Sequence, residues 1–332
     1  MSLPDVVDVL AAPDPLAVLA AAEPEDLLAF RTSATAGRAR TVLRTSRSWV
    51  ESYPHVSDLL GMTRASRVWV PGPLSATMNL FAVAHAAWAG AETVSGPHDA
   101  THAHLTPWLL RRQLAEDAGA LSGVHLVVAG DRLSRSLGQE AVAAGARVSH
   151  YYGAAELSFV AWGEHAGALL PFPGVEVVAR DGELWVRSPY VCGGYAEPQQ
   201  VLRRDPDGWT TVGDRGEVRE DGTGVRVTVF GRSGGVTTAG ATVLAADIEH
   251  ALQAEATGEV AVIGLPHPDL GQVVTAVVTD PGDLARLREV SRRLLAPQQQ
   301  PRRWLHLPSL PLTGAGKVDR AAVVRAVAER DA

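Results

Sequence analysis

The hydrophobic pattern in the first half of the chain alternates between short apolar runs and longer amphipathic stretches. This pattern predicts strands at residues 68–70, 92–94, 125–129 and 147–151, and helices at residues 77–89, 107–118 and 134–144. Strand–helix alternation at this spacing favours a parallel sheet covered by helices. Because ligands of such sheets bind at the carboxyl ends of the strands, the loop after Tyr151 is a candidate site before any motif is considered.

Beyond residue 171 the helical pattern stops and the apolar positions alternate, which indicates an antiparallel β section. Asp181-Gly182 separates two alternating runs, and a second hairpin is predicted with its turn near Asp221-Gly222. The second ribbon brings Asp214 and Arg232 towards one end. The glycine pair that follows, Gly234-Gly235, can adopt backbone angles closed to other residues, so we expect a hinge there.

The last hundred residues predict a small α+β domain. A helix is expected at residues 247–254, strands at 260–265, 273–279 and 304–307, and two further helices capped by Asp283 and Asp319. A glycine-rich loop, PLTGAGK, ends at Lys317 just before the final helix. We therefore predict two domains, a large one at residues 1–232 and a mobile α+β lid at residues 233–332.

Composition narrows the class of protein. The chain has 332 residues, 46% of them apolar, and a net charge of −7 without a long basic cluster, so a nucleic-acid partner is not expected. Cys192 is the only cysteine, which suits a reducing compartment. The acidic N-terminus does not resemble a signal peptide, and the longest apolar run, at residues 79–91, is too short to span a bilayer. A cytoplasmic protein without integral membrane association is expected.

Six short motifs occur in a fixed order along the chain. They are TSATAGRAR (32–40), YYGAAE (151–156), GELWVRSPYVCGGY (182–195), GWTTVGD (208–214), GRSGGVTTAG (231–240) and PLTGAGKVDR (311–320). Together they resemble the motifs of the adenylate-forming superfamily, and among its branches the short-form acyl-CoA synthetases and o-succinylbenzoate-CoA ligases. The resemblance extends from about residue 31 to the end of the chain. It implies an α/β fold with an N-terminally shortened large domain and a small C-terminal lid.

The resemblance implies an acid–thiol ligase that joins a carboxylic acid to coenzyme A, using ATP and Mg²⁺, through an acyl-adenylate. In that family, lid rotation brings the segment around Gly240 to the thiol. The resemblance assigns the phosphates of ATP to Thr32, Ser33, Thr35 and Arg40. It places Tyr152 and Gly153 by the adenine, and Asp214 and Arg232 at the ribose and phosphate side. It makes Glu156 the metal ligand and Lys317 the catalytic cation. Gly193, Gly194 and Tyr195 are expected to be structural.

The phosphate loop departs from the family pattern TSGTTG-x-P-K. Ala34 and Ala36 replace a glycine and a threonine, Ala39 replaces the proline, and Arg40 replaces the lysine. These changes leave open a weakly catalytic or non-catalytic nucleotide-binding relative. A second alternative is an enzyme that loads its acyl group onto an acyl carrier protein.

Two other patterns compete with this interpretation. GRSGG at residues 231–235 matches the G-x-S-x-G elbow of serine hydrolases, but Val236-Thr237-Thr238 is a poor helix start and the elbow must open into a helix. His98, His102 and His104 share one polar stretch, yet their spacing fits no common zinc site, so a solvated loop is expected.

Overall fold

The computed structural model describes residues 6–31, 40–167, 169–197, 202–222, 224–232, 235–238, 241–313 and 318–331. The chain divides into two compact units, Met1–Val229 and Phe230–Ala332. Helices of the first unit are α1 (Pro15–Ala21), α2 (Arg47–Val50), α3 (Tyr53–Leu60), α4 (Thr77–Trp88), α5 (Pro107–Asp117) and α6 (Arg135–Ala143), with 3-10 turns η1 (Val9–Ala11), η2 (Pro97–Asp99) and η3 (Ala118–Leu121). The strands up to the unit boundary are β1 (Val7–Asp8), β2 (Leu27–Arg31), β3 (Thr41–Thr45), β4 (Arg67–Trp69), β5 (Glu92–Val94), β6 (His102–Leu105), β7 (His125–Val128), β8 (Arg147–Ala154), β9 (Ser158–Gly163), β10 (Leu169–Pro171), β11 (Glu176–Arg180), β12 (Glu183–Arg187), β13 (Gly194–Tyr195), β14 (Arg203–Arg204), β15 (Thr210–Thr211), β16 (Asp214–Asp221) and β17 (Gly224–Arg232).

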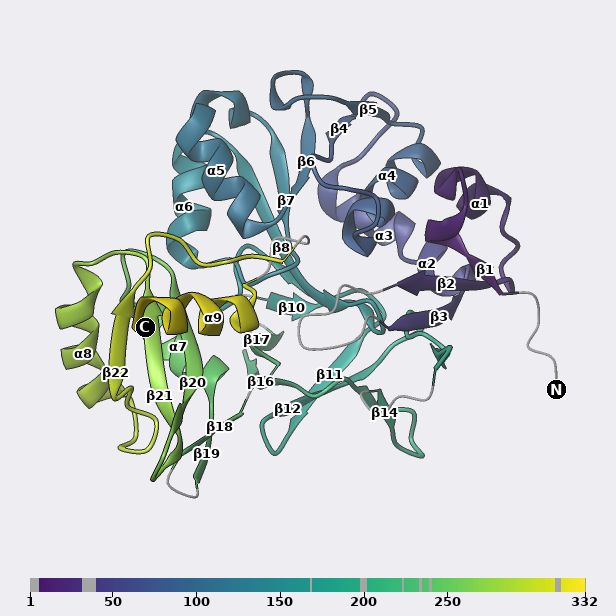
Figure 1. Cartoon of the computed structure of the whole chain (residues 1–332). Helices are drawn as coiled ribbons and strands as arrows, with labels where there is room; N and C mark the ends of the chain where they lie inside the picture. Colours follow the sequence, from purple (N-terminus) through teal and green to yellow (C-terminus); the bar gives the residue numbers. More distant parts are fainter. Residues whose placement is uncertain are drawn as a thin grey trace. The chain divides into compact units, whose positions relative to one another are not determined.

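The parallel part of the large sheet has the order β5-β4-β6-β7-β8. Along β7 the side chains alternate between two cores: Leu126 and Val128 pack with residues of α5 and α6, whereas Val127 packs with residues of α3 and α4. Figure 1 shows these two pairs of helices on opposite sides of the strands. The predicted parallel, helix-covered sheet is therefore confirmed.

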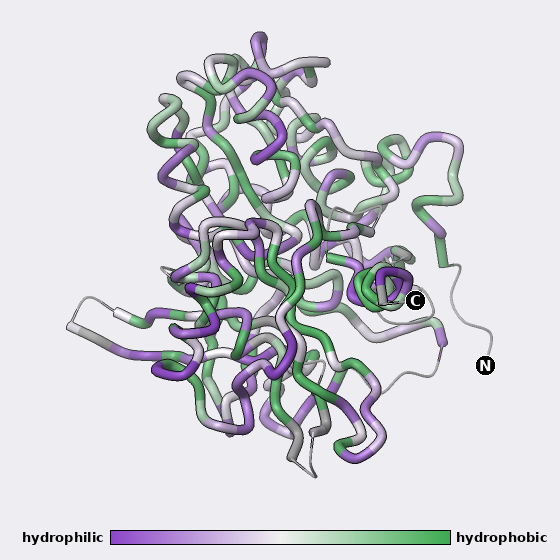
Figure 2. The backbone as a smooth tube through the Cα atoms, turned by 60° about the vertical axis from the view of Figure 1, so that its left-hand side comes forward, coloured by the Kyte–Doolittle hydropathy of each residue, from purple (hydrophilic) through white to green (hydrophobic). Residues whose placement is uncertain are grey.

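The sheet continues into an antiparallel section at β9. Asp181 and Gly182 form the two-residue turn between β11 and β12 with positive φ values of 50° and 73°, as the Asp-Gly pair predicts. The second predicted hairpin is β16 paired with β17. In Figure 2 hydrophobic colour follows many strands, and hydrophilic colour marks many of the turns between them.

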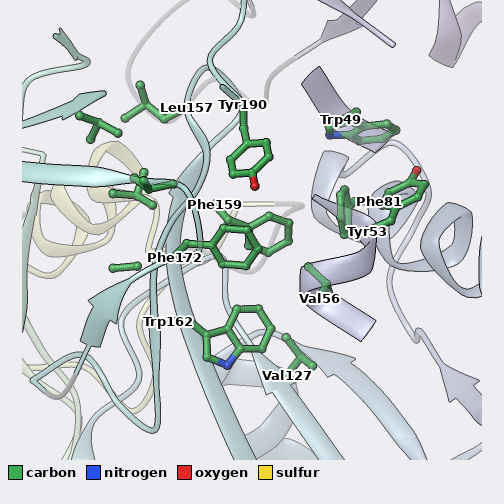
Figure 3. Close-up of a cluster of buried hydrophobic side chains, with 14 of the residues drawn as sticks. Trp49, Tyr53, Val56, Phe81, Val127, Leu157, Phe159, Trp162, Phe172 and Tyr190 are labelled. Atoms are coloured by element: carbon green, nitrogen blue, oxygen red, sulfur yellow. The ribbon is translucent and has the colours of Figure 1, made fainter. Parts of the chain in front are cut away.

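An aromatic core lies where the antiparallel section meets the helices. The rings of Phe159 and Phe172 stack at a centroid distance of 4.9 Å, and Tyr190 meets Phe172 edge-on at 5.6 Å. Figure 3 shows these rings together with Trp162 and, across the cluster, Phe81. This core anchors Tyr190, which belongs to the GELWVRSPYVCGGY motif, and Leu157, which directly follows the YYGAAE motif.

The second unit contains β18 (Gly235–Thr238), β19 (Ala241–Leu244), α7 (Ala245–Gln253), β20 (Val260–His267), β21 (Gly271–Val278), α8 (Asp283–Leu294), β22 (Arg303–His306) and α9 (Arg320–Asp331). Its sheet has the order β19-β18-β21-β20, and β22 pairs parallel to β21. One face packs against α7 and α8 and the other against α9. This is the predicted small α+β fold.

Two local predictions in this unit have different outcomes. Asp319 caps α9, because its Oδ1 accepts the Ala322 N–H at 2.9 Å. Asp283 does not cap α8, since the helix begins at Asp283 itself after Gly282. Its buried carboxylate instead accepts the backbone N–H groups of Thr257 and Gly258, so it ties the helix start to a distant loop.

The histidine stretch is not the solvated loop that the sequence predicts. His98 is exposed, but His102 and His104 are buried on β6, a strand absent from the prediction. Across the described residues, no group of three or more His, Cys, Asp or Glu side chains is placed to hold a metal ion. Within the same residues, no helix is long and apolar enough to cross a membrane.

Candidate active site

The YYGAAE motif lies at the carboxyl end of β8 and in the turn to β9. The pairing of these strands shifts register at Tyr152 and Gly153, and Ala154 pairs with Ser158. Glu156 therefore sits in a tight turn at the ligand-binding end of the sheet, where the strand pattern predicts a site.

Gly153 is required by the close approach of these two strands. A Cβ atom on Gly153 would lie 2.2 Å from the carbonyl oxygen of Ser158, a distance that no side chain tolerates without movement of the backbone. The absence of a side chain thus permits the bulge that orients Tyr152 and the following turn.

Glu156 is held by the segment that contains the GGY motif. Its carbonyl oxygen accepts the Cys192 N–H at 2.8 Å, and its Oε1 accepts the Tyr195 hydroxyl at 2.7 Å. Glu156 is only 4% exposed. Tyr195 was expected to be only a packed aromatic, and the structure corrects this because its hydroxyl binds the predicted metal ligand.

Strand β13, which carries Tyr195, pairs with β3. Tyr195 lies opposite Val42, and the Ala196 N–H donates to the Thr41 carbonyl at 2.9 Å. Arg40, the last residue of the predicted phosphate loop, precedes Thr41. Burial and the bond to Glu156 raise the pKa of Tyr195, and the positive charge of Arg40 opposes that rise. The charge of Arg40 therefore acts on the same Tyr195 hydroxyl that is bonded to Glu156.

A buried arginine, Arg44, also interacts with Glu156. Arg44 on β3 is 1% exposed, and its Nη2 donates to the Tyr190 carbonyl at 2.5 Å. Burial lowers the pKa of Arg44 to about 10, while the side chains of Cys192 and Glu156 oppose the shift. The guanidinium still remains charged near neutral pH and offsets part of the cost of burying the Glu156 carboxylate.

Asp214 and Tyr152 form a second tyrosine–carboxylate pair. Asp214 is the first residue of β16 and is buried, and its Oδ2 accepts the Tyr152 hydroxyl at 2.8 Å. The structure thus joins the YYGAAE and GWTTVGD motifs, which are 62 residues apart along the chain. The bond fixes the orientation of the Asp214 carboxylate, a group type that accepts hydrogen bonds from hydroxyls.

A cavity of about 490 Å³ adjoins Tyr195. It is lined by residues 193–197, Leu202 and Arg204. The Arg204 Nη2 donates to the Cys192 carbonyl at 3.2 Å, and Glu197 accepts the Thr41 N–H and hydroxyl. The cavity wall is therefore made from the same segment that holds Glu156.

Several predicted site residues lie outside the described residues. These are Thr32, Ser33, Thr35, Gly240 and Lys317, together with the side chain of Arg232 and the hinge residues Ser233 and Gly234. The residues after Ser233 form the strand β18 from Gly235, not the helix that a nucleophile elbow requires. The hydrolase alternative therefore lacks its structural context.

The carboxylates of the described residues indicate how the implied Mg²⁺ could be held. The described residues provide a buried carboxylate at Glu156 and no cluster of several acidic ligands. Mg²⁺ is commonly held by one or two carboxylates together with the phosphates of a nucleotide. Glu156 therefore fits a cation that arrives with ATP, and it does not fit an all-protein metal cage.

Comparisons with known proteins identify the family. The AMP-binding enzyme C-terminal domain model matches residues 247–317. A probable 2-succinylbenzoate–CoA ligase of Mycobacterium tuberculosis is 30% identical over 315 residues, which cover 90% of this chain and 79% of the relative. The chain belongs to the adenylate-forming superfamily.

Two other relatives are longer than this adenylate-forming chain, which covers only part of each. The acyl–CoA ligase YhfT of Bacillus subtilis is 27% identical over 328 residues, covering 88% of this chain and 67% of YhfT. A salicyl-AMP ligase / salicyl-S-ArCP synthetase of M. tuberculosis is 37% identical over 153 residues, which are 44% of this chain and 26% of that protein. The chain thus spans between about a quarter and two thirds of these two relatives.

Solved structures show the same fold. ATP-bound MatB from Rhodopseudomonas palustris matches with a TM-score of 0.77 at 24% identity, covering 92% of this chain and 69% of MatB. The amide bond synthetase McbA from Marinactinospora thermotolerans matches with a TM-score of 0.74 at 28% identity, covering 90% of this chain and 69% of McbA. The adenylate-forming fold predicted from the six motifs is confirmed.

Proposed function

We propose that this protein is an ATP-dependent carboxylate–CoA ligase that forms an acyl-adenylate and releases pyrophosphate. The observation that carries the proposal is the pair of buried carboxylates, Glu156 and Asp214, each bonded to a motif tyrosine. The proposal is also supported by two relatives that are named as CoA ligases. Burial of a carboxylate is costly unless it is paired and hydrogen-bonded, so two such groups among the motif residues favour a role in binding a ligand.

In the proposed complex each motif acts on one part of the nucleotide. Asp214, oriented by Tyr152, accepts the ribose hydroxyls, and Tyr152 and Gly153 border the adenine. Thr32, Ser33, Thr35 and Arg40 hold the β- and γ-phosphates, Arg232 supports the ribose and phosphate side, and Glu156 holds Mg²⁺ that arrives with ATP. The cation, when bound, neutralises phosphate charge.

The first half-reaction brings two anions together, because a carboxylate attacks the α-phosphate. A cation is needed where negative charge accumulates, and we assign this role to Lys317. Loss of one preorganised contact of this kind typically lowers the rate by about 10²–10³-fold. In the second half-reaction we propose that residues 233–235 act as a hinge. Rotation there withdraws Lys317 and presents the segment around Gly240 to the thiol of coenzyme A.

Pyrophosphate release tests the proposal directly. The protein is incubated with ATP, Mg²⁺ and coenzyme A against aryl, succinylbenzoyl-type and fatty acids, and the succinylbenzoyl type is our first candidate because of the 2-succinylbenzoate–CoA ligase relative. We expect release that needs both acid and ATP. No release with any acid, while calorimetry still shows AMP binding, would instead support a non-catalytic nucleotide-binding protein.

A single substitution separates the two half-reactions. We expect Lys317→Ala to reduce acyl-adenylate formation by about 10²–10³-fold while it largely spares thioester formation from pre-made acyl-adenylate. Arg325→Ala, on the final helix, is a matched control for loss of a positive charge in the same domain. Equal losses in both half-reactions for Lys317→Ala would contradict the assigned role.

A carrier protein is the second candidate acceptor. The salicyl-S-ArCP synthetase relative, which is 37% identical over 153 residues, favours this alternative. A comparison of free coenzyme A with a pantetheine-bearing carrier protein as thiol acceptor distinguishes the two. Thioester formation on the carrier alone would replace the CoA ligase assignment.

A further inference from the structure

The hydroxyl of Tyr195 is the only hydrogen-bond donor, among the described residues, that reaches the Glu156 carboxylate. It approaches Oε1 at 2.7 Å from a segment 39 residues further along the chain. The same segment also binds the Glu156 main chain through the Cys192 N–H at 2.8 Å. Two bonds from one segment therefore fix both the backbone and the carboxylate of Glu156.

The segment that provides these bonds is itself held firmly. Strand β13 pairs with β3, and the Gly193 N–H donates to the Leu43 carbonyl at 2.8 Å. On the other side, Tyr190 packs on Phe172 in the aromatic core (Figure 3). Tyr195 is thus presented from a rigid support, which a residue that orients another side chain requires.

The bond has a direct consequence for the two oxygens of Glu156. An ionised carboxylate accepts through both oxygens, and a hydroxyl at 2.7 Å is a strong, charge-assisted donor. Oε1 is committed to Tyr195, which fixes the rotation of the carboxylate group. Oε2 is left as the oxygen with which Glu156 can meet a cation.

Packing alone does not explain a tyrosine at this position. A phenylalanine would fill the same half-buried space, but it would leave Oε1 of a nearly buried carboxylate without its donor. Oxygen ligands of metal ions are generally oriented by a second residue in this way, and loss of that residue typically weakens metal binding by about 10–100-fold.

We propose that Tyr195 is a positioning residue that orients Glu156 to receive the divalent cation carried by ATP. This inference rests on the proposed nucleotide-binding function. It assigns to Tyr195 a role through Glu156 and no contact with the reacting atoms. It also predicts that the two residues act as one unit.

The test measures metal-dependent nucleotide affinity, which does not require turnover. Binding of Mn²⁺·ATP is followed by water-proton relaxation, and binding of metal-free ATP by equilibrium dialysis with a chelator. The ratio of the two affinities is compared between wild type, Tyr195→Phe, Glu156→Gln and the double variant. Tyr190→Phe is the matched control, because among the described residues its hydroxyl bonds the Pro173 carbonyl, at 3.0 Å, and not Glu156.

We expect the ratio to fall at least about tenfold in Tyr195→Phe and in Glu156→Gln, with metal-free ATP binding preserved. The affinity ratio of the double variant should be no lower than that of Glu156→Gln alone, since both changes remove the same interaction. Tyr190→Phe should keep the wild-type ratio.

An unchanged ratio in Tyr195→Phe, or additive losses in the double variant, would overturn the positioning role. A wild-type ratio in Glu156→Gln, or a wild type whose ATP affinity does not depend on Mn²⁺, would overturn it as well, because Glu156 would then not hold the cation. The ligase proposal is judged separately by pyrophosphate release. A Tyr195-dependent ratio without turnover would retain the positioning role and remove the ligase assignment.

Discussion

Five histidines are buried in the described part of the first unit, and the folded-state pKa values of four of them make its stability sensitive to mild acid. These four are His85 on α4, His104 on β6, His125 on β7 and His150 on β8. Burial also lowers the pKa of the fifth, His102 on β6. Burial lowers the pKa to about 4 for His85, His125 and His150 and to about 3 for His104, and neighbouring positive groups such as Arg147 lower that of His125 further. Each ring is therefore neutral in the folded protein at pH 5 to 7.

The unfolded chain, with histidine pKa values near 6.5, binds these protons first. Stability is therefore complete above pH 6.5 and is lost as the pH falls towards the folded-state pKa values. From the four shifts, the free energy of unfolding should fall by about 7 kcal/mol between pH 7 and pH 5. That loss is comparable with the total stability of an ordinary domain, about 5–15 kcal/mol.

Urea unfolding followed by tryptophan fluorescence measures this loss. Trp304 is the only tryptophan beyond residue 229, so the signal reports mainly on the first unit. Near pH 5.5 the slope of unfolding free energy with pH should correspond to uptake of about three to four protons. The acidic side chains should add their own effect only at lower pH.

Substitution of a histidine identifies which side chain takes up a proton on unfolding. His85→Gln should reduce the uptake by about one proton, because the glutamine cannot titrate. A slope of less than one proton in the wild type between pH 6.5 and 5 would refute the conclusion that these rings are buried and neutral.

Two further substitutions test local stability by urea denaturation at pH 7.5. Gly153→Ala should cost about 2–3 kcal/mol, because its Cβ meets Ser158 O at 2.2 Å, whereas Gly96→Ala, with open space around its Cβ, should be nearly neutral. Asp283→Ala should cost about 3 kcal/mol, because two backbone N–H groups lose their acceptor, whereas the exposed Glu289→Ala should cost less than about 1 kcal/mol. A similar cost for both members of either pair would contradict the stated cause.

Much of the fold follows from short-range patterns. The alternation of apolar runs predicted α4, α5 and α6 and the strands β4, β5, β7 and β8, because periodicity is a local property of the chain. The Asp181-Gly182 turn and the Asp319 cap were predictable for the same reason, since each depends on neighbours within three residues. The family also followed from the sequence, because its motifs are contiguous.

The pairings within the site were not predictable from sequence. Tyr195 bonds Glu156 across 39 residues, and Tyr152 bonds Asp214 across 62 residues. Nothing local distinguishes a tyrosine that packs from one whose hydroxyl faces a distant carboxylate. Arg44 is similar, because a strand arginine ordinarily lies in water and only the tertiary fold buries it.

Burial of polar side chains marks the boundary between what sequence and tertiary structure decide. Strand β6 belongs to a histidine-rich stretch for which the sequence predicts a loop, yet the fold buries His102 and His104. His102 is stabilised there by bonds to Thr101 and to the Leu60 carbonyl, which α3 brings from a distant part of the chain. The sequence by itself determined the strand–helix alternation of the parallel sheet, the Asp-Gly turn and the family. Tertiary structure decided which polar groups are buried, because burial depends on partners that only the folded chain brings together.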